Sequence, residues 1–153
     1  MGRAIIAAAA IVLCVLTQPL QADRRDRCTN VDGTLVFHAT SPDSFESVLS
    51  GDLQGILVGT NFRIVKVGDD GTLFGVVDHA FVSTRGTFYT FAEVVLSPIG
   101  ANLYRTSERN FFLGGTGDFT GANGTLLIQA FADFTIGAGS GHYHGRLCAG
   151  AFS

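Results

Sequence analysis

GGTGDFTGANG, residues 114–124, places five glycines within eleven residues and leads directly into the apolar run 125–131. Nucleotide-binding glycine loops open a helix, and a P-loop carries Lys after its last glycine. This segment has no Lys, the following run is strand-like, and the Asp118 carboxylate would repel a phosphate. Phe119 and Ala122 favour burial, which argues against a linker. The stretch predicts a bulged corner and hairpin of a β-sheet. We assign this structural role to Gly114, Gly115, Gly117, Phe119, Gly121 and Gly124.

The rest of the sequence predicts an all-β domain. After residue 23, apolar, β-branched and aromatic residues come in short runs separated by turn residues, and only Ser44–Leu49 suits a short turn of helix. Asp-Gly at 70–71 and Asn-Gly at 123–124 favour tight hairpins, so we expect an antiparallel meander. The expected strands are 34–40, 55–67, 71–83, 87–96, 102–107, 110–113, 124–136 and 141–148.

Residues 1–22 have the layout of a secretory signal peptide. A positive start is followed by the apolar run 4–16, and Ala22 precedes a charged cluster. This run is shorter than the roughly 20 residues of a membrane span, although a retained N-terminal anchor is the alternative. We therefore expect a signal peptide (1–22), an N-terminal segment (23–33) and a β-barrel domain (34–153). The mature protein is expected to be extracellular or periplasmic, without a membrane attachment.

The net charge limits the partners that we expect, and the cysteine content predicts how the domain closes. Without residues 1–22, nine Lys and Arg face thirteen Asp and Glu, a net charge of −4. This surface repels phosphate backbones, so nucleic acid is not an expected partner.

Cys28 and Cys148 lie near the two ends of the mature chain and predict a disulfide between its first and last segments, although two unrelated buried thiols are the alternative. An antiparallel sheet must close into a barrel or fold into a sandwich to protect its edges, and such a disulfide favours the barrel.

Three segments resemble one group of proteins. Residues 114–124 resemble the GGTGxFxxAxG signature of plant dirigent proteins and the similar GGSGxFxGAxG of allene oxide cyclases. RGTFYTFAE, residues 85–93, is similar to the G-P-Y-x-x-Y-E-D strand of the cyclases. TLVFH, residues 34–38, resembles the first dirigent strand, which reads Tyr-Phe-His-Asp. The match is best over residues 86–130.

The resemblance implies a single antiparallel eight-stranded β-barrel, dirigent-like and calycin-type, with a central apolar cavity. Relatives hold a reactive small molecule in one shape while it cyclises or couples, they use no cofactor, and homo-oligomers are common among them. Glu93 and the glycine corner match the cyclase pattern. Ala39 follows His38 where dirigent proteins have Asp, so the acid associated with their chemistry is missing at that position.

Alternation along strand 87–96 divides its side chains between two faces. Tyr89, Phe91 and Glu93 share one face. If this face lines the lumen, burial raises the pKa of Glu93, which can then act as a general acid or base beside Tyr89. If it does not, Glu93 is a solvated rim residue. Arg85 can clamp a substrate carboxylate or, alternatively, form a surface salt bridge.

Further candidates for ligand contacts are His38, His79, Phe91 and Gln129. His142 and His144 lie on the same face of a strand, where two histidines provide the first two ligands in several β-barrel metal sites. Gly145 and Arg146 follow them where such a site would offer Glu, so no metal is expected. The resemblance implies that no cofactor is used either. The sequon at Asn123 is an acceptor for glycosylation, although Asn123 also suits the hairpin turn.

These patterns lead to three hypotheses. The first is a secreted barrel that binds a hydrophobic small molecule in its lumen and steers its cyclisation or stereoselective coupling, as a cofactor-free isomerase-like or dirigent-like protein. The second is a non-catalytic ligand-binding barrel, which a lumen without ionisable side chains would favour. The third is a structural protein whose barrel is filled by its thirteen Phe residues, which the lack of a ligand-sized cavity would favour.

Overall fold

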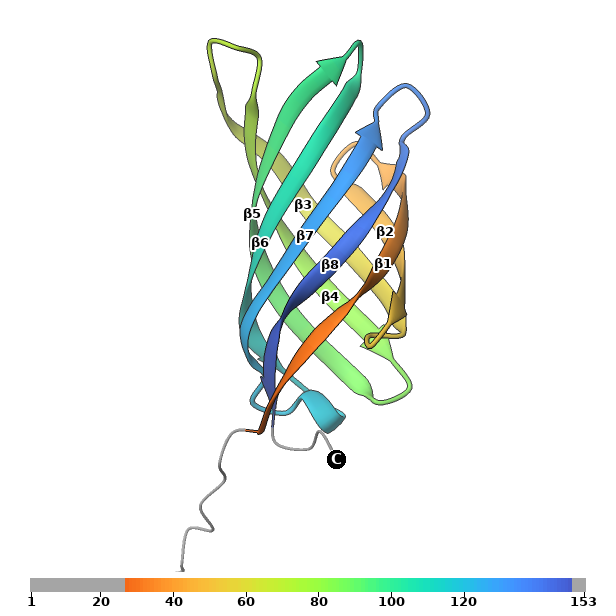
Figure 1. Ribbon diagram of the computed structural model, residues 1–153, viewed down its shortest axis with the longest axis vertical. Helices are drawn as coiled ribbons and strands as arrows, with labels where there is room; N and C mark the ends of the chain where they lie inside the picture. The colour runs from red at the N-terminus through yellow and green to blue at the C-terminus, as the bar shows by residue number, and fades with distance from the viewer. Residues whose placement is uncertain (1–26, 150–153) are drawn as a thin grey trace, which may run out of the picture.

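The computed structural model describes residues 27–149, in which eight strands form a closed antiparallel barrel in chain order (Figure 1). Each strand pairs with the next, and β8 returns to pair with β1. This confirms the predicted all-β, eight-stranded barrel. The predicted signal peptide, residues 1–22, lies outside the described residues. The elements are β1 (Arg27–Ser41), β2 (Ser44–Gly51), β3 (Gly55–Val67), β4 (Leu73–Ser83), β5 (Gly86–Gly100), β6 (Leu103–Gly115), the 3-10 turn η1 (Gly117–Phe119), β7 (Asn123–Asp133) and β8 (Ala138–Ala149).

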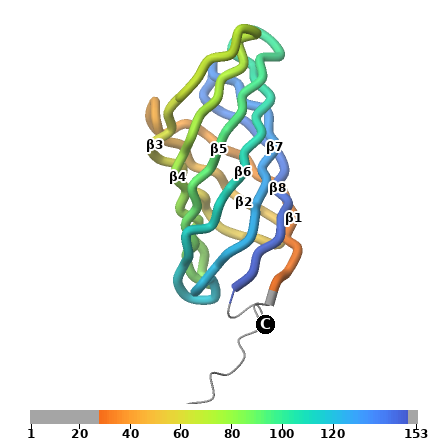
Figure 2. Tube along the Cα trace, turned by 90° about the vertical axis from the view of Figure 1, so that its left-hand side faces the viewer, coloured from red at the N-terminus to blue at the C-terminus, as the bar shows by residue number. Residues whose placement is uncertain are grey.

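The barrel closes because every strand has two neighbours, which leaves no exposed edge among the described strands. The tube in Figure 2 shows β3, β4, β5 and β6 side by side as they wind around the long axis. Within residues 27–149, no helix is long and apolar enough to span a membrane.

Three strands differ from their predictions. Residues 44–49 belong to β2 rather than to a helical turn, because Ser47 and Leu49 face the lumen while Val48 faces outward, and the strand fills the gap between β1 and β3. β6 runs unbroken through residues 108–109, where we expected a break between two short strands. β1 begins at Arg27, before the expected residue 34, because its first residues pair with the end of β8.

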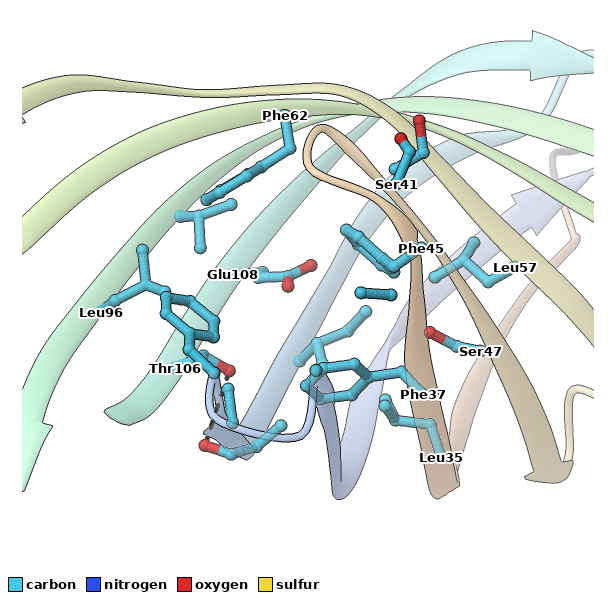
Figure 3. Close-up of a pocket in the computed structure, with 18 of the residues that line it drawn as sticks. Leu35, Phe37, Ser41, Phe45, Ser47, Leu57, Phe62, Leu96, Thr106 and Glu108 are labelled. Carbon is cyan, nitrogen blue, oxygen red and sulfur yellow. Dashed lines mark hydrogen bonds between the residues drawn. The ribbon is translucent and has the colours of Figure 1, made fainter. Parts of the chain in front are cut away.

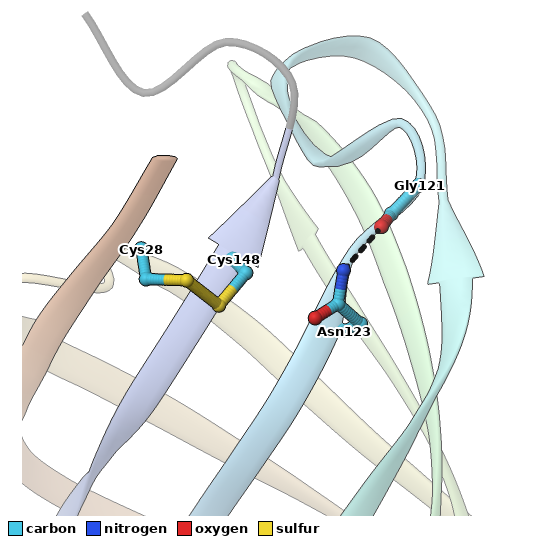
Figure 4. The surroundings of a disulfide bond; sticks show 4 residues. All are labelled: Cys28, Gly121, Asn123 and Cys148. Carbon is cyan, nitrogen blue, oxygen red and sulfur yellow. Dashed lines mark hydrogen bonds between the residues drawn. A yellow bond between two sulfur atoms is a disulfide. The ribbon is translucent and has the colours of Figure 1, made fainter. Parts of the chain in front are cut away.

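A disulfide joins the first strand to the last, as predicted. Cys28 and Cys148 are directly opposite in the register of β1 and β8 and form the bond shown in Figure 4. The two cysteines are 120 residues apart in the sequence, and their bond holds β1 against β8, where the barrel closes. Disulfides are typical of extracellular and periplasmic proteins.

The glycine-rich stretch forms the predicted corner between β6 and β7, but the tight turn expected at Asn-Gly 123–124 is absent there, because Asn123 and Gly124 are the first residues of β7 and pair with β8. The register of β5 and β6 shifts between Tyr89 and Thr90, where a bulge places Leu113 outside the regular pairing. The chain then makes the single turn η1 and enters β7. Phe119 and Ala122, which we expected to be buried, are 2% and 4% exposed. The residues with positive φ here are Gly114, Gly117, Gly121 and Gly124.

Aromatic side chains fill the end of the barrel that contains this corner. Phe81 and Phe88 stack with their ring centroids 4.6 Å apart, and Phe119 meets both rings edge-on. Beside them, the Tyr143 hydroxyl accepts a 2.8 Å hydrogen bond from the Leu53 backbone N–H. This end is therefore a packed core, as a barrel of eight strands allows. The hypothesis of a filled barrel fits this end alone, because the other end is hollow.

Candidate functional site

The other end of the barrel holds an apolar chamber of about 270 Å³. It lies where the β1–β2 and β7–β8 turns contribute Pro42 and Gly137 to the lining. Most of its walls are inward-facing side chains of the strands (Figure 3). The volume is close to the lower end of the usual range for small-molecule sites, about 300–1,000 Å³. The lining residues include Phe37, Phe45, Phe62, Phe134, Thr106 and Glu108.

In the part of the chain that the structure describes, one ionisable side chain lines this chamber, and it belongs to Glu108 of β6. The side chain is 12% exposed, and its Oε2 atom is buried without a hydrogen-bond partner. Removal from water disfavours the charged carboxylate and raises the pKa of Glu108 to about 7. Figure 3 shows the carboxyl directed into the chamber among apolar side chains. Near neutral pH, Glu108 can therefore both donate and accept a proton.

Behind Glu108, three polar side chains form a buried cluster. Asn110 Oδ1 accepts a 2.8 Å hydrogen bond from Thr90 Oγ1 and lies 2.9 Å from His79 Nδ1. Because an amide oxygen accepts only, the imidazole proton lies on Nδ1. Nε2 is then the acceptor nitrogen of the ring, and it lies 3.8 Å from Glu108 Oε2.

Burial also determines the charge of His79. The residue is 3% exposed, and desolvation lowers its pKa to about 4, although the bond to Asn110 and the negative charge of Asp78 act in the opposite direction. His79 is consequently neutral near pH 7 and provides no positive charge for Glu108. The Nδ2 atom of Asn110 and Nε2 of His79 are buried without partners, so the cluster retains unused hydrogen-bonding capacity.

The structure places most of the predicted site residues away from this chamber. On β5 the inward face carries Phe88, Thr90 and Ala92, so Glu93 and Tyr89 are exposed on the outer face. The solvated alternative for Glu93 agrees with this placement. The proposed pairing of Glu93 with Tyr89 in the lumen has no support, because strand alternation fixes two faces but not which of them turns inward.

Arg85 also lies outside the chamber. It occupies the β4–β5 turn, where its Nε atom donates a 2.7 Å hydrogen bond to Asp118 Oδ2 in the glycine corner. This ion pair is the surface salt bridge that we gave as the alternative to a substrate clamp. Both side chains are more than one third exposed, so the pair contributes little to stability.

Of the four candidates for ligand contacts, His79 alone faces the lumen. His38 is exposed on β1, with its Nε2 atom 4.0 Å from Glu46 Oε2. Gln129 is exposed on the outer face of β7, and Phe91 is half-buried on that of β5. The outer face of β8 carries His142 and His144, opposite Thr34 and Asp32. The Asn123 side chain donates a 3.2 Å hydrogen bond to the Gly121 carbonyl (Figure 4).

Sequence reasoning missed Glu108, Asn110 and Thr90. A signal for the first two was present, because Thr106, Glu108 and Asn110 alternate along β6 and therefore share one face. Polar residues at alternate positions are usually read as the solvated face of a strand, so the pattern alone points outward. Only the closure of the barrel shows that this polar face is the inner one.

Comparison with known proteins adds little to this description. No protein-family model and no curated protein matches the chain. Among solved structures, it is similar to a pterocarpan synthase dirigent protein, with 17% identity, a TM-score of 0.33, and coverage of 88% of this chain and 96% of the other. A likeness at this level transfers no residue role or activity. It is the closed eight-stranded barrel itself that agrees with the fold implied by the resemblance to dirigent proteins and allene oxide cyclases.

Proposed function

We propose that the protein is a secreted, cofactor-free barrel that binds a hydrophobic small molecule in the chamber and steers its cyclisation or coupling. The observation that supports this most directly is the Glu108 carboxyl, buried without a partner in an otherwise apolar chamber. Burying a polar group without a hydrogen bond costs roughly 1–3 kcal/mol. Such a cost is typical of functional sites, where a ligand supplies the missing partner.

The chamber offers two contributions to such a reaction. Its aromatic and aliphatic walls restrict the conformations that a flexible ligand can adopt, which favours one cyclisation or coupling product over others. Glu108, with a pKa of about 7, can give a proton to a ligand oxygen or take one from a ligand hydroxyl as bonds rearrange. A lumen without ionisable side chains would favour the carrier, and Glu108 lines this chamber, so we keep the steering function as the first candidate.

Binding is tested with prodan, a neutral naphthalene ketone whose fluorescence reports a non-polar environment. Ala132 lines the chamber, so Ala132→Phe should fill it and weaken prodan binding at least about tenfold. Ala80 lies on the outer face of β4, and Ala80→Phe makes the same change as a matched control. Equal prodan binding by both variants would show that the chamber is not the ligand site.

Steering is tested with the natural ligand. Native mass spectrometry of protein purified from its own host identifies any small molecule that accompanies it. Incubation of this molecule, or of its reactive precursor, with the protein should change the ratio of isomeric products, and Glu108→Gln should reduce that change. A co-purified ligand whose products are the same with and without the protein would leave the carrier as the function.

A further inference from the structure

The Glu108 carboxyl has no positive partner in the chamber. Within residues 27–149, none of the side chains that line the chamber is basic. Behind the chamber, the Nε2 atom of His79 on β4 lies 3.8 Å from Oε2, and burial keeps His79 neutral. The chamber side chains of β1, β2, β5 and β7 are apolar or carry hydroxyl groups only. A cationic ligand can therefore supply the counter-charge that the lining does not provide for an ionised Glu108.

Aromatic side chains line the same chamber as this carboxyl. In the view of Figure 3, Phe62 lies above Glu108, Phe45 to its right and Phe37 below it. The rings of Phe37 and Phe45 have their centroids 6.0 Å apart, and Phe134 lines the same chamber. The face of an aromatic ring attracts a cation within about 6 Å of its centroid, and more strongly where water is excluded. A single acid inside an aromatic enclosure is complementary to an organic cation.

We propose that the chamber takes a hydrophobic amine, whose ammonium group pairs with the Glu108 carboxylate while its apolar body packs against the phenylalanine rings. The inference rests on the proposed function in one respect, that the chamber is the ligand site. A carboxylate of the same shape would be buried without a cation to offset its lost hydration, and an alcohol would gain one hydrogen bond without an ion pair.

The protons of this binding step can be counted. Below pH 7 the Glu108 carboxyl of the empty protein is largely neutral, and the ammonium ion enters with its proton. Formation of the ion pair then releases the Glu108 proton to solvent, one for each amine bound. An alcohol leaves the carboxyl neutral and releases none. Proton release therefore separates the two ligand classes independently of affinity.

The experiment is isothermal titration calorimetry of the full protein at pH 6, in buffers of different ionisation enthalpy. The ligands are 2-phenylethylamine, 2-phenylethanol and phenylacetate, which share a ring and a short side chain. We expect the amine to bind at least about tenfold more tightly than the alcohol, with proton release, and phenylacetate to bind most weakly. Glu108→Gln should reduce amine affinity to that of the alcohol and abolish proton release, while alcohol binding remains.

Glu46 on the outside of β2 is the matched control, and Glu46→Gln should leave all three affinities unchanged. Gln has the shape of a protonated Glu, and retained prodan binding by Glu108→Gln shows that the variant is folded. Prodan binding without a preference for the amine overturns the proposed ligand class but leaves the proposed function intact. If prodan and all three ligands fail to bind, both proposals are overturned.

Discussion

Glu108 Oε2 and His79 Nε2 lie 3.8 Å apart inside the barrel, and neither atom has a hydrogen-bond partner. Burial shifts their pKa values in opposite directions, to about 7 for the carboxyl and about 4 for the imidazole, because it disfavours the charged form of each. Both groups are therefore neutral over an interval of mildly acidic pH. In that pH interval the site therefore holds a neutral acid and a neutral base and no ion pair.

This pair makes a prediction about stability and pH. The raised pKa of Glu108 contributes stability that is complete below its ordinary pKa of 4.5 and is lost as pH rises to about 7. The lowered pKa of His79 contributes stability that is complete above 6.5 and is lost as pH falls to about 4. As pH rises from 4.5 to 6.5, the stability lost through Glu108 is offset by the stability gained through His79.

Single substitutions should expose each contribution. Relative to the unsubstituted protein, Glu108→Gln should become more stable as pH rises from 4.5 to 7, by on the order of 3 kcal/mol. His79→Asn, which keeps a donor for Asn110, should become relatively less stable as pH rises from 4 to 6.5. Urea denaturation at several pH values measures both trends. Parallel pH profiles for the three proteins would contradict the opposite shifts.

The fold was more predictable from the sequence than the site. The Asp-Gly turn at 70–71 and the cysteine pair report local geometry or chain closure, and each is recognised from the residues themselves. The expected strands include seven of the eight that the structure shows, with β6 expected as two strands and β2 missed. β2 was missed because the short polar segment SFES at its start lacks a clear apolar alternation.

The site depends on which face of each strand turns inward. Both faces of β5 are largely apolar, and packing in a narrow lumen selects the face with the smaller Thr90 and Ala92, while Phe91 and Glu93 turn outward. On β6 the inward face carries Glu108 and Asn110, which composition alone assigns to solvent. Such choices are made by the closed barrel as a whole, so one strand read by itself does not reveal them.

The disulfide provides a second prediction. Cys28 and Cys148 close a loop that spans 120 residues of sequence. In the chain-entropy model, removing such a crosslink destabilises a protein by about 4–5 kcal/mol, because the unfolded chain gains freedom. We expect the Cys28→Ser, Cys148→Ser double variant to show a lower denaturation midpoint in urea, and the reduced protein to match it. A midpoint unchanged by reduction would show that strand pairing alone secures the seam between β1 and β8.

A third prediction concerns Phe119, which closes the packed end of the barrel. Its ring is 2% exposed and meets Phe81 and Phe88 edge-on. Phe119→Ala should cost about 3–5 kcal/mol, through lost burial and the cavity that remains. Phe131 is 52% exposed on the outer face, and Phe131→Ala should cost less than about 1 kcal/mol. Urea denaturation compares the two.

The position of Phe119 also makes this test specific to stability. The chamber lies at the opposite end of the barrel, and its lining does not include Phe119. The folded fraction of Phe119→Ala should consequently bind prodan as the unsubstituted protein does. A loss of prodan affinity in fully folded Phe119→Ala would mean that the packed core and the chamber are mechanically coupled.

The last prediction separates two glycines of the corner. Gly121 and Gly124 both have positive φ, +71° and +119°, which L residues rarely adopt. A Cβ atom at Gly121 would meet nothing within 4 Å, whereas one at Gly124 would overlap the backbone carbonyl oxygen of Arg146 on β8. Gly121→Ala should therefore cost only the conformational strain, about 1–2 kcal/mol. Gly124→Ala should cost clearly more, because β7 and β8 must also separate at that point. Thermal denaturation of both variants measures the difference, and equal losses would mean that only the turn conformation, and not the close approach of the strands, requires glycine here.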